Sequence, residues 1–190
     1  MILPIRAFGD AVLRKHCHEI DKDYPGLNEL ISNMFETMES AHGIGLAAPQ
    51  IGLDIRLFIA DLSPLAEDED YADIADELKD FKKVFINAKI LEESGEEWKF
   101  NEGCLSIPDV REDVKRKETI LIEYYDENFV KHTDTFSDMR ARVIQHEYDH
   151  IEGILFTDHL SSLKKKLVKG KLVKISHGDV AVNYKMRFPK

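Results

Sequence analysis

The spacing of apolar residues predicts three helices. In the first, apolar side chains recur at intervals of three and four residues, the pattern of a helix with one buried face. Gly153 is expected to end the second helix, and Gly170 to interrupt the third. The predicted helices span residues 27–41, 138–152 and 160–172.

Strand-like runs lie between these helices without the regular strand–helix–strand order of a parallel sheet. Two of the runs flank Asp126-Glu127-Asn128, which predicts a β-hairpin. The C-terminal run is the weakest in pattern. The predicted strands span residues 55–62, 83–91, 118–125, 129–136 and 180–188. This mixture indicates the α+β class.

Length and composition indicate one soluble domain over residues 1–190. No apolar run approaches the roughly 20 residues of a membrane span, and the first residues do not resemble a secretory signal. We therefore expect a cytoplasmic protein without a membrane partner. The net charge of −10 argues against DNA or RNA as the substrate.

Charge is concentrated in two segments. The segment at 64–82 holds eight acidic residues against one lysine between Pro64 and Asp80, and the segment at 160–174 holds six lysines and no acid. We interpret these as a solvated surface insertion and a solvated helix face. The alternative for the lysine-rich segment is docking on an anionic surface such as RNA.

The most specific motif is His146-Glu147-Tyr148-Asp149-His150 in the second predicted helix. Residues four apart lie on one helix face, so both imidazoles can reach one metal ion. Glu147 is then placed to contact a water on that ion. The pattern indicates metal-assisted hydrolysis, whereas the alternative is a chance match on a solvated helix.

A catalytic site of this kind needs a third protein ligand. The metzincin position for a third histidine holds Phe156, and no glutamate follows Glu152. Cys104 is the better candidate, because it lies in a small-residue turn where Gly103 lets the backbone pass close to an ion. Gly103 is also expected to contact the substrate. The alternative is an inert buried cysteine. Four other residues remain formally open as ligands: Asp158, His159, His177 and Asp179.

The segment from Gly43 to Gln50 matches the residue pattern of a dinucleotide-binding fingerprint, but it lacks the expected structural context. It follows a helix instead of a strand, and Pro49 interrupts the expected helix start. An apolar strand ending in the Gln50 amide suits a site beside a metal-bound carbonyl, and Ile44 and Gly45 are placed to pair with an extended peptide.

Two residues on the metal-binding helix point to an apolar subsite. Val143 and Met139 lie one and two turns before the motif, so they are expected to line a pocket that suits a methionine side chain. Ordinary core packing is the alternative for both.

Three ordered segments resemble the peptide deformylases: Gly43 to Gln50, Glu102 to Ser106, and Gln145 to His150. The resemblance covers about residues 5–165. It implies mixed or antiparallel sheets wrapped around a central helix that carries the HExxH motif, with an additional N-terminal helix.

The resemblance also implies an activity, the removal of formyl groups from N-formylmethionyl peptides. It implies Fe²⁺ held by Cys104, His146 and His150, with Zn²⁺, Ni²⁺ or Co²⁺ as substitutes. Glu147 is the expected general base, and the side chain of Gln50 and the backbone of Leu105 are the expected donors to the reacting oxygen. For the lysine-rich segment, the expected partner is the ribosome, through a transient contact. The competing hypotheses are an HExxH metallopeptidase and a non-catalytic metal or peptide-binding module.

Overall fold

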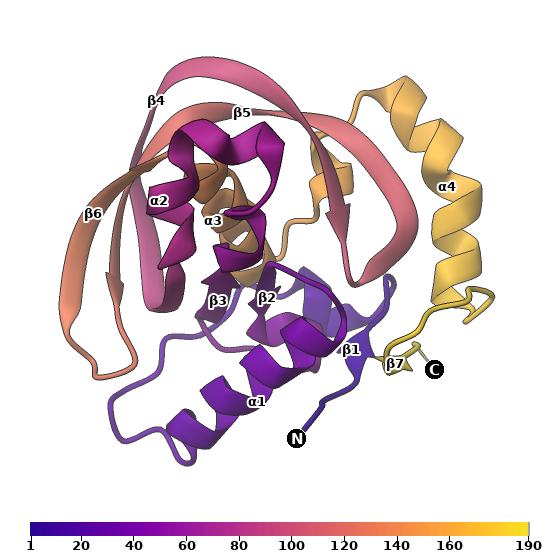
Figure 1. Cartoon of the computed structure of the whole chain (residues 1–190). Helices are drawn as coiled ribbons and strands as arrows, with labels where there is room; N and C mark the ends of the chain where they lie inside the picture. Colours follow the sequence, from indigo (N-terminus) through magenta and orange to yellow (C-terminus); the bar gives the residue numbers. More distant parts are fainter. Residues whose placement is uncertain (190) are drawn as a thin grey trace.

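The computed structural model describes residues 1–189, which form a mixed α+β fold with four α-helices and an antiparallel sheet (Figure 1). The helices are α1 (Leu27–Ser40), α2 (Ala75–Lys79), α3 (Asp138–Ile151) and α4 (Ser162–Ser176). The strands are β1 (Ile5–Arg6), β2 (Gly45–Ala47), β3 (Leu57–Asp61), β4 (Lys82–Cys104), β5 (Ile107–Tyr125), β6 (Lys131–Ser137) and β7 (Met186–Arg187).

The main sheet has five strands in the order β2-β3-β4-β5-β6, every neighbouring pair being antiparallel. Its longest feature is the β4–β5 hairpin, which bends through several register shifts. The hairpin closes tightly, since Cys104 pairs with Ile107 and only two residues lie between them. The remaining strands, β1 and β7, pair in parallel as a separate two-stranded sheet.

Helix α3 packs against strands from both ends of the main sheet, including β2, β3, β5 and β6. Its apolar side chains, among them Ala141, Ile144 and Ile151, are fully buried. The ribbons of β4 and β5 pass over this helix in Figure 1. The motif from His146 to His150 therefore lies on a helix that is held by tertiary packing.

The helices predicted over 27–41 and 138–152 are confirmed as α1 and α3. The interruption predicted at Gly170 is wrong, because α4 runs through that residue. Nothing lies within 4 Å of the position that a Cβ would take there. One glycine costs a helix only about 1 kcal/mol, so it weakens α4 without breaking it.

Three predicted strands differ from the observed ones. The run at 118–125 is only the last part of β5, which begins at Ile107. The run at 83–91 belongs to β4, which continues to Cys104 through a stretch of mostly exposed, charged residues. Such a strand buries little of either face, so the sequence carries no alternation of polar and apolar residues there. In the tail, only Met186 and Arg187 form a strand, in place of the range 180–188.

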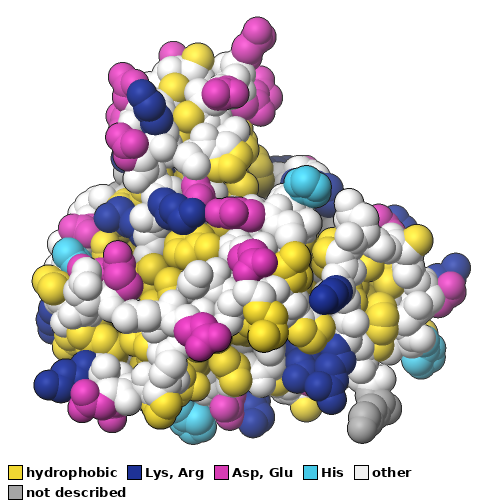
Figure 2. All heavy atoms as spheres, turned by 60° about the horizontal axis from the view of Figure 1, so that its bottom comes forward, with side chains coloured by type: hydrophobic (Ala, Val, Ile, Leu, Met, Phe, Trp, Pro, Cys, Tyr) yellow, Lys and Arg dark blue, Asp and Glu magenta, His cyan; other side chains and the backbone are white. Residues whose placement is uncertain are grey.

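The acidic stretch at 64–82 contains two 3-10 segments followed by α2. Its charged residues face solvent, but Leu78 and Phe81 are buried in the main core cluster. Charges of both signs are spread over the molecular face in Figure 2, with apolar side chains exposed between them. No helix within residues 1–189 is both long and apolar enough to cross a membrane.

Candidate metal centre

The structure brings three potential metal ligands together from two distant elements. Cys104 ends β4, and His146 and His150 lie one turn apart on α3. Their ligand atoms all lie within 4.8 Å of one another. The Sγ atom of Cys104 is 3.3 Å from Nε2 of His150. The other candidates for the third ligand, Asp158, His159, His177 and Asp179, are not part of this cluster.

The cluster fits a small divalent ion such as zinc or ferrous iron. Sulfur and nitrogen ligands of a tetrahedral zinc ion are about 3.6 Å apart, from bond lengths of about 2.3 and 2.05 Å, close to the 3.3 Å observed for one pair. One thiolate and two imidazoles are a donor set that suits Zn²⁺ and Fe²⁺. Three protein ligands leave a coordination position for water or substrate, the pattern of a catalytic site.

The charges in the cluster favour the ligating form of the cysteine. Burial raises the pKa of Cys104, but the charges and hydrogen bonds of His150 and His146 outweigh burial and lower this pKa to about 5. Burial lowers the pKa of His146, yet hydrogen bonds with Cys104 and Glu102 raise it well above its ordinary value. The thiolate, which is the form of cysteine that binds a metal ion, is thus stabilised at neutral pH.

Glu147 lies beside the ligands and comes very close to the backbone of β2. A Cβ on Gly45 would lie 2.4 Å from Oε1 of Glu147, so only glycine leaves room for this carboxyl group. The other oxygen, Oε2, is buried with no hydrogen-bond partner in the described part of the chain. Burial raises the pKa of Glu147 to about 7, against the charges of His146 and His150. A group with such a pKa can both take up and release a proton at neutral pH.

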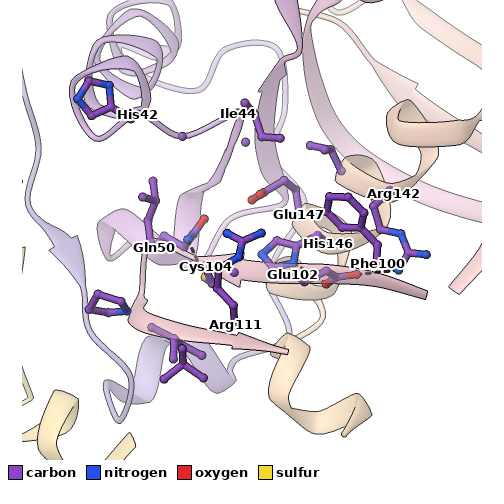
Figure 3. Close-up of a pocket in the computed structure, with 18 of the residues that line it drawn as sticks. His42, Ile44, Gln50, Phe100, Glu102, Cys104, Arg111, Arg142, His146 and Glu147 are labelled. Atoms are coloured by element: carbon purple, nitrogen blue, oxygen red, sulfur yellow. Dashed lines mark hydrogen bonds and ion pairs between the residues drawn. The ribbon is translucent and has the colours of Figure 1, made fainter. Parts of the chain in front are cut away.

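Gln50 points its amide toward the cysteine (Figure 3). It lies on a short 3-10 segment, Ala48–Ile51, that follows β2. The backbone N–H of Ala47 donates to its Oε1 at 2.8 Å, which fixes the orientation of the amide. Nε2 is then left to donate, at 3.4 Å from both Sγ of Cys104 and Oγ of Ser106. Leu105 follows the cysteine in the tight turn and lines the same pocket.

A buried carboxylate holds one of the histidines. Glu102 accepts from Nδ1 of His146 at 3.0 Å, which leaves Nε2 of that ring free to bind an ion. It also accepts from Nε and Nη2 of Arg116 and from Nη1 of Arg142, at 2.8 to 3.0 Å. Burial raises the pKa of Glu102, but hydrogen bonds from His146 and Arg116 hold it far below its usual range.

Both arginines of this network are themselves fixed in place. Arg142 is 1% exposed and stacks over the ring of Trp98 at 4.3 Å. Arg116 reaches Oδ2 of Asp149 at 2.8 Å, and Asp149 also accepts from Nε2 of His159 at 2.7 Å. The charges around His146 therefore form one connected network of hydrogen bonds.

The cluster opens into a cavity of about 940 Å³. Its lining includes every residue that the sequence proposed for substrate binding: Ile44, Gly45, Gly103, Met139 and Val143. The space beside Gly103 is taken by Arg111, whose Nη1 lies 2.7 Å from the position of a Cβ.

Sequence reasoning missed several residues of the site. Glu102 was part of a recognised motif, but its partners Arg116 and Arg142 lie far away along the chain. Tyr71, from the acidic insertion, lines the cavity, with its hydroxyl 3.9 Å from Sδ of Met139. Tyr184, from the tail, lines it on another side. No local pattern marks either tyrosine.

Comparison with known proteins gives a consistent picture. A family model described as polypeptide deformylase matches residues 2–166. A protein of Christiangramia forsetii named peptide deformylase is 63% identical over 190 residues, covering 100% of this chain and 97% of the relative. A protein of the same name from Flavobacterium johnsoniae is 60% identical, with 99% and 96% of the two chains covered.

Solved structures show the same similarity. A crystal structure of peptide deformylase from Thermus thermophilus has a TM-score of 0.79 and 38% identity, covering 92% of this chain and 98% of that one. One from Legionella pneumophila has a TM-score of 0.79 and 35% identity, covering 94% and 98%.

Proposed function

Because the chain belongs to the peptide deformylase family, we propose that it removes the formyl group from the N-terminus of N-formylmethionyl peptides and nascent proteins, releasing formate. The observation that carries this proposal is the cluster of Cys104, His146 and His150 beside an unpartnered buried oxygen of Glu147. Cys104 and His146, together with the base, line one cavity, as hydrolysis of an amide requires.

We assign Cys104, His146 and His150 as the metal ligands, with Fe²⁺ as the native ion and Zn²⁺, Ni²⁺ or Co²⁺ as substitutes. When bound, such an ion acts as a Lewis acid on the formyl carbonyl and lowers the pKa of a water ligand from about 15.7 toward roughly 7. The donor set supports an ion of this group but does not choose among its members.

Glu147 is the proposed general base. Its Oε2 takes a proton from the attacking water and then delivers that proton to the nitrogen of the leaving amine. Burial raises the pKa of this carboxyl group, which helps it to hold the proton between the two steps. Gly45 holds the backbone of β2 close to this carboxyl group, so the base cannot move far from the reacting atoms.

Negative charge develops on the formyl oxygen during attack. We propose that Nε2 of Gln50 and the backbone N–H of Leu105 donate to that oxygen. The Gln50 amide is held ready by Ala47, so no reorganisation is needed at the moment of reaction. Losing one donor of this kind typically costs about 3–4 kcal/mol of transition-state stabilisation.

Substrate binding is assigned to the walls of the same cavity. Val143 and Met139 would contact the methionine side chain, because both are apolar and lie one and two turns before the motif. Ile44 and Gly45 would pair with the peptide backbone. Gly103 would contact the substrate at the same wall, where Arg111 occupies the place of a Gly103 side chain. Contacts through the backbone explain how one enzyme accepts many nascent sequences.

Three broader assignments follow from this function. We propose that residues 1–190 form a single catalytic domain and that α3 is its central helix, which the contacts of α3 with four strands support. We propose action in the cytoplasm, where formylated nascent chains emerge. A transient contact of the lysine-rich segment at 160–174 with the ribosome is the proposed partner interaction, supported by its six lysines.

The test is formate release from formyl-Met-Ala-Ser by protein purified anaerobically, together with analysis of its metal. The Glu147→Gln variant should keep the metal content of the wild type and lose turnover. Internal cleavage of peptides without formate release would instead indicate a metallopeptidase. A Glu147→Gln variant that retains activity would remove Glu147 as the base.

A further inference from the structure

The C-terminal tail returns to the active site after α4. The helix ends at Ser176, and Gly178, with a φ of +78°, turns the chain back. Strand β7 then pairs with β1, where Ile5 N–H donates to Lys185 O at 2.9 Å and Ala7 N–H donates to Arg187 O at 3.0 Å. The next residue of the N-terminal segment, Phe8, donates to Ser106 O at 2.8 Å. Through this N-terminal segment the tail is fastened to the turn that follows Cys104.

One residue of the tail contacts that turn directly. The hydroxyl of Tyr184 donates to the carbonyl oxygen of Leu105 at 2.8 Å. Burial raises the pKa of Tyr184 above its ordinary value, so the hydroxyl stays protonated and remains a donor. Residues 181–184 also line the catalytic cavity. The tail therefore forms part of the wall around the site.

The turn that Tyr184 contacts is short and has little conformational freedom. Only Leu105 and Ser106 lie between Cys104 and Ile107, which are paired across the hairpin. Ser106 and Ile107 are fully buried. In so short a turn, rotation of one peptide unit tilts the next one, so fixing the carbonyl of Leu105 also limits the direction of its N–H.

We propose that Tyr184 is a positioning residue for the reaction, which holds the Leu105 carbonyl so that the Leu105 N–H points at the reacting oxygen. This inference rests on the proposed function for the identity of that oxygen. It predicts a loss in the chemical step, because Tyr184 would act through Leu105 on charge that develops only during attack.

The experiment compares Tyr184→Phe with the wild type in the full, metal-loaded chain. Removing the hydroxyl should lower kcat between about twofold and tenfold, the range set by one hydrogen bond, with KM and metal content unchanged. In ¹⁵N-labelled protein, the amide resonances of Leu105 and Ser106 should shift or broaden. This second readout does not depend on the reaction.

Two matched controls separate positioning from general stability. Tyr124→Phe removes a buried hydroxyl that donates to Asp134 at 2.8 Å, outside the lining of the cavity, so it should lower thermal stability and leave kcat unchanged. Lys185→Ala alters an exposed tail side chain and should change neither.

The inference is overturned if Tyr184→Phe keeps the wild-type kcat, or if Tyr124→Phe lowers kcat as much. A wild-type protein that releases no formate would refute the proposed function instead. In that case, unchanged Leu105 and Ser106 resonances in Tyr184→Phe would refute the positioning role, and shifted resonances would support the contact on which it rests.

Discussion

Replacing Glu102 with glutamine tests the charge network behind His146. The carboxylate accepts four hydrogen bonds, three from arginines and one from His146. A glutamine keeps only one oxygen, so two of these bonds are lost and an NH₂ group faces arginine donors. Hydrogen bonds to charged groups contribute about 1.5–3 kcal/mol each. The expected loss of unfolding free energy is therefore about 3–6 kcal/mol.

Urea denaturation of the metal-free protein at neutral pH measures the unfolding free energy. In a separate measurement on folded protein, competition with a chromophoric zinc chelator gives the zinc affinity. Metal affinity should fall about 10-fold to 100-fold, as for other groups that orient a metal-binding histidine. Glu123→Gln is the control, because Glu123 pairs with Lys131 at the surface and such pairs contribute at most about 1 kcal/mol. A loss below about 1 kcal/mol for Glu102→Gln, or an unchanged zinc affinity, would refute the reasoning.

The same reasoning predicts how the difference in unfolding free energy between wild type and Glu102→Gln depends on pH. The pKa of Glu102 is held far below its unfolded value of about 4.3, so its stabilisation is fully present above that value. It is lost as the pH falls toward the folded pKa. The difference between wild type and Glu102→Gln should shrink by up to about 2 kcal/mol from pH 5 to pH 3, at about 1.36 kcal/mol per pKa unit. A constant difference would contradict the assignment.

Two further predictions concern close packing and thiol chemistry. Gly45→Ala should abolish formate release, since the new Cβ would lie 2.4 Å from Glu147 Oε1. The control Gly170→Ala, in open space on α4, should keep activity and raise the unfolding free energy by up to about 1 kcal/mol. An active Gly45→Ala enzyme would refute the contact. In metal-free protein at pH 7, iodoacetamide should alkylate Cys104 before Cys17, as followed by peptide mass mapping, and zinc should protect Cys104. Burial raises the pKa of Cys17 to about 11, while the neighbouring imidazoles overcome burial at Cys104, so faster labelling of Cys17 would contradict this order.

The cluster of Cys104, His146 and His150 could be predicted from sequence because each part of it belongs to a local motif. Two histidines four apart on a helix face one ion, and Cys104 lies in a motif of its own. The second half of β4 could not be predicted, since its exposed residues give no alternating pattern. The role of Glu102 was hidden for a different reason. Its partners Arg116 and Arg142 come from β5 and α3, and only the folded chain brings them together.

The C-terminal tail is a second case in which the sequence does not reveal a long-range contact. Its residues alternate weakly, and the strand predicted there is mostly absent. What matters for the site is the single hydroxyl of Tyr184 at Leu105, a contact between residues 79 positions apart. A sequence pattern records which face of an element is buried, but it does not record which distant backbone group a side chain meets.

The closed hairpin at Cys104 also limits how this chain can vary in length. Side chains on a strand alternate between its two faces, so one residue added between Cys104 and Ile107 would shift the pairing and turn the sulfur away from α3. Insertions at the β5–β6 connection, by contrast, would lengthen a loop that does not line the cavity. Evolutionary length changes should therefore collect in such loops and avoid the two residues after the cysteine.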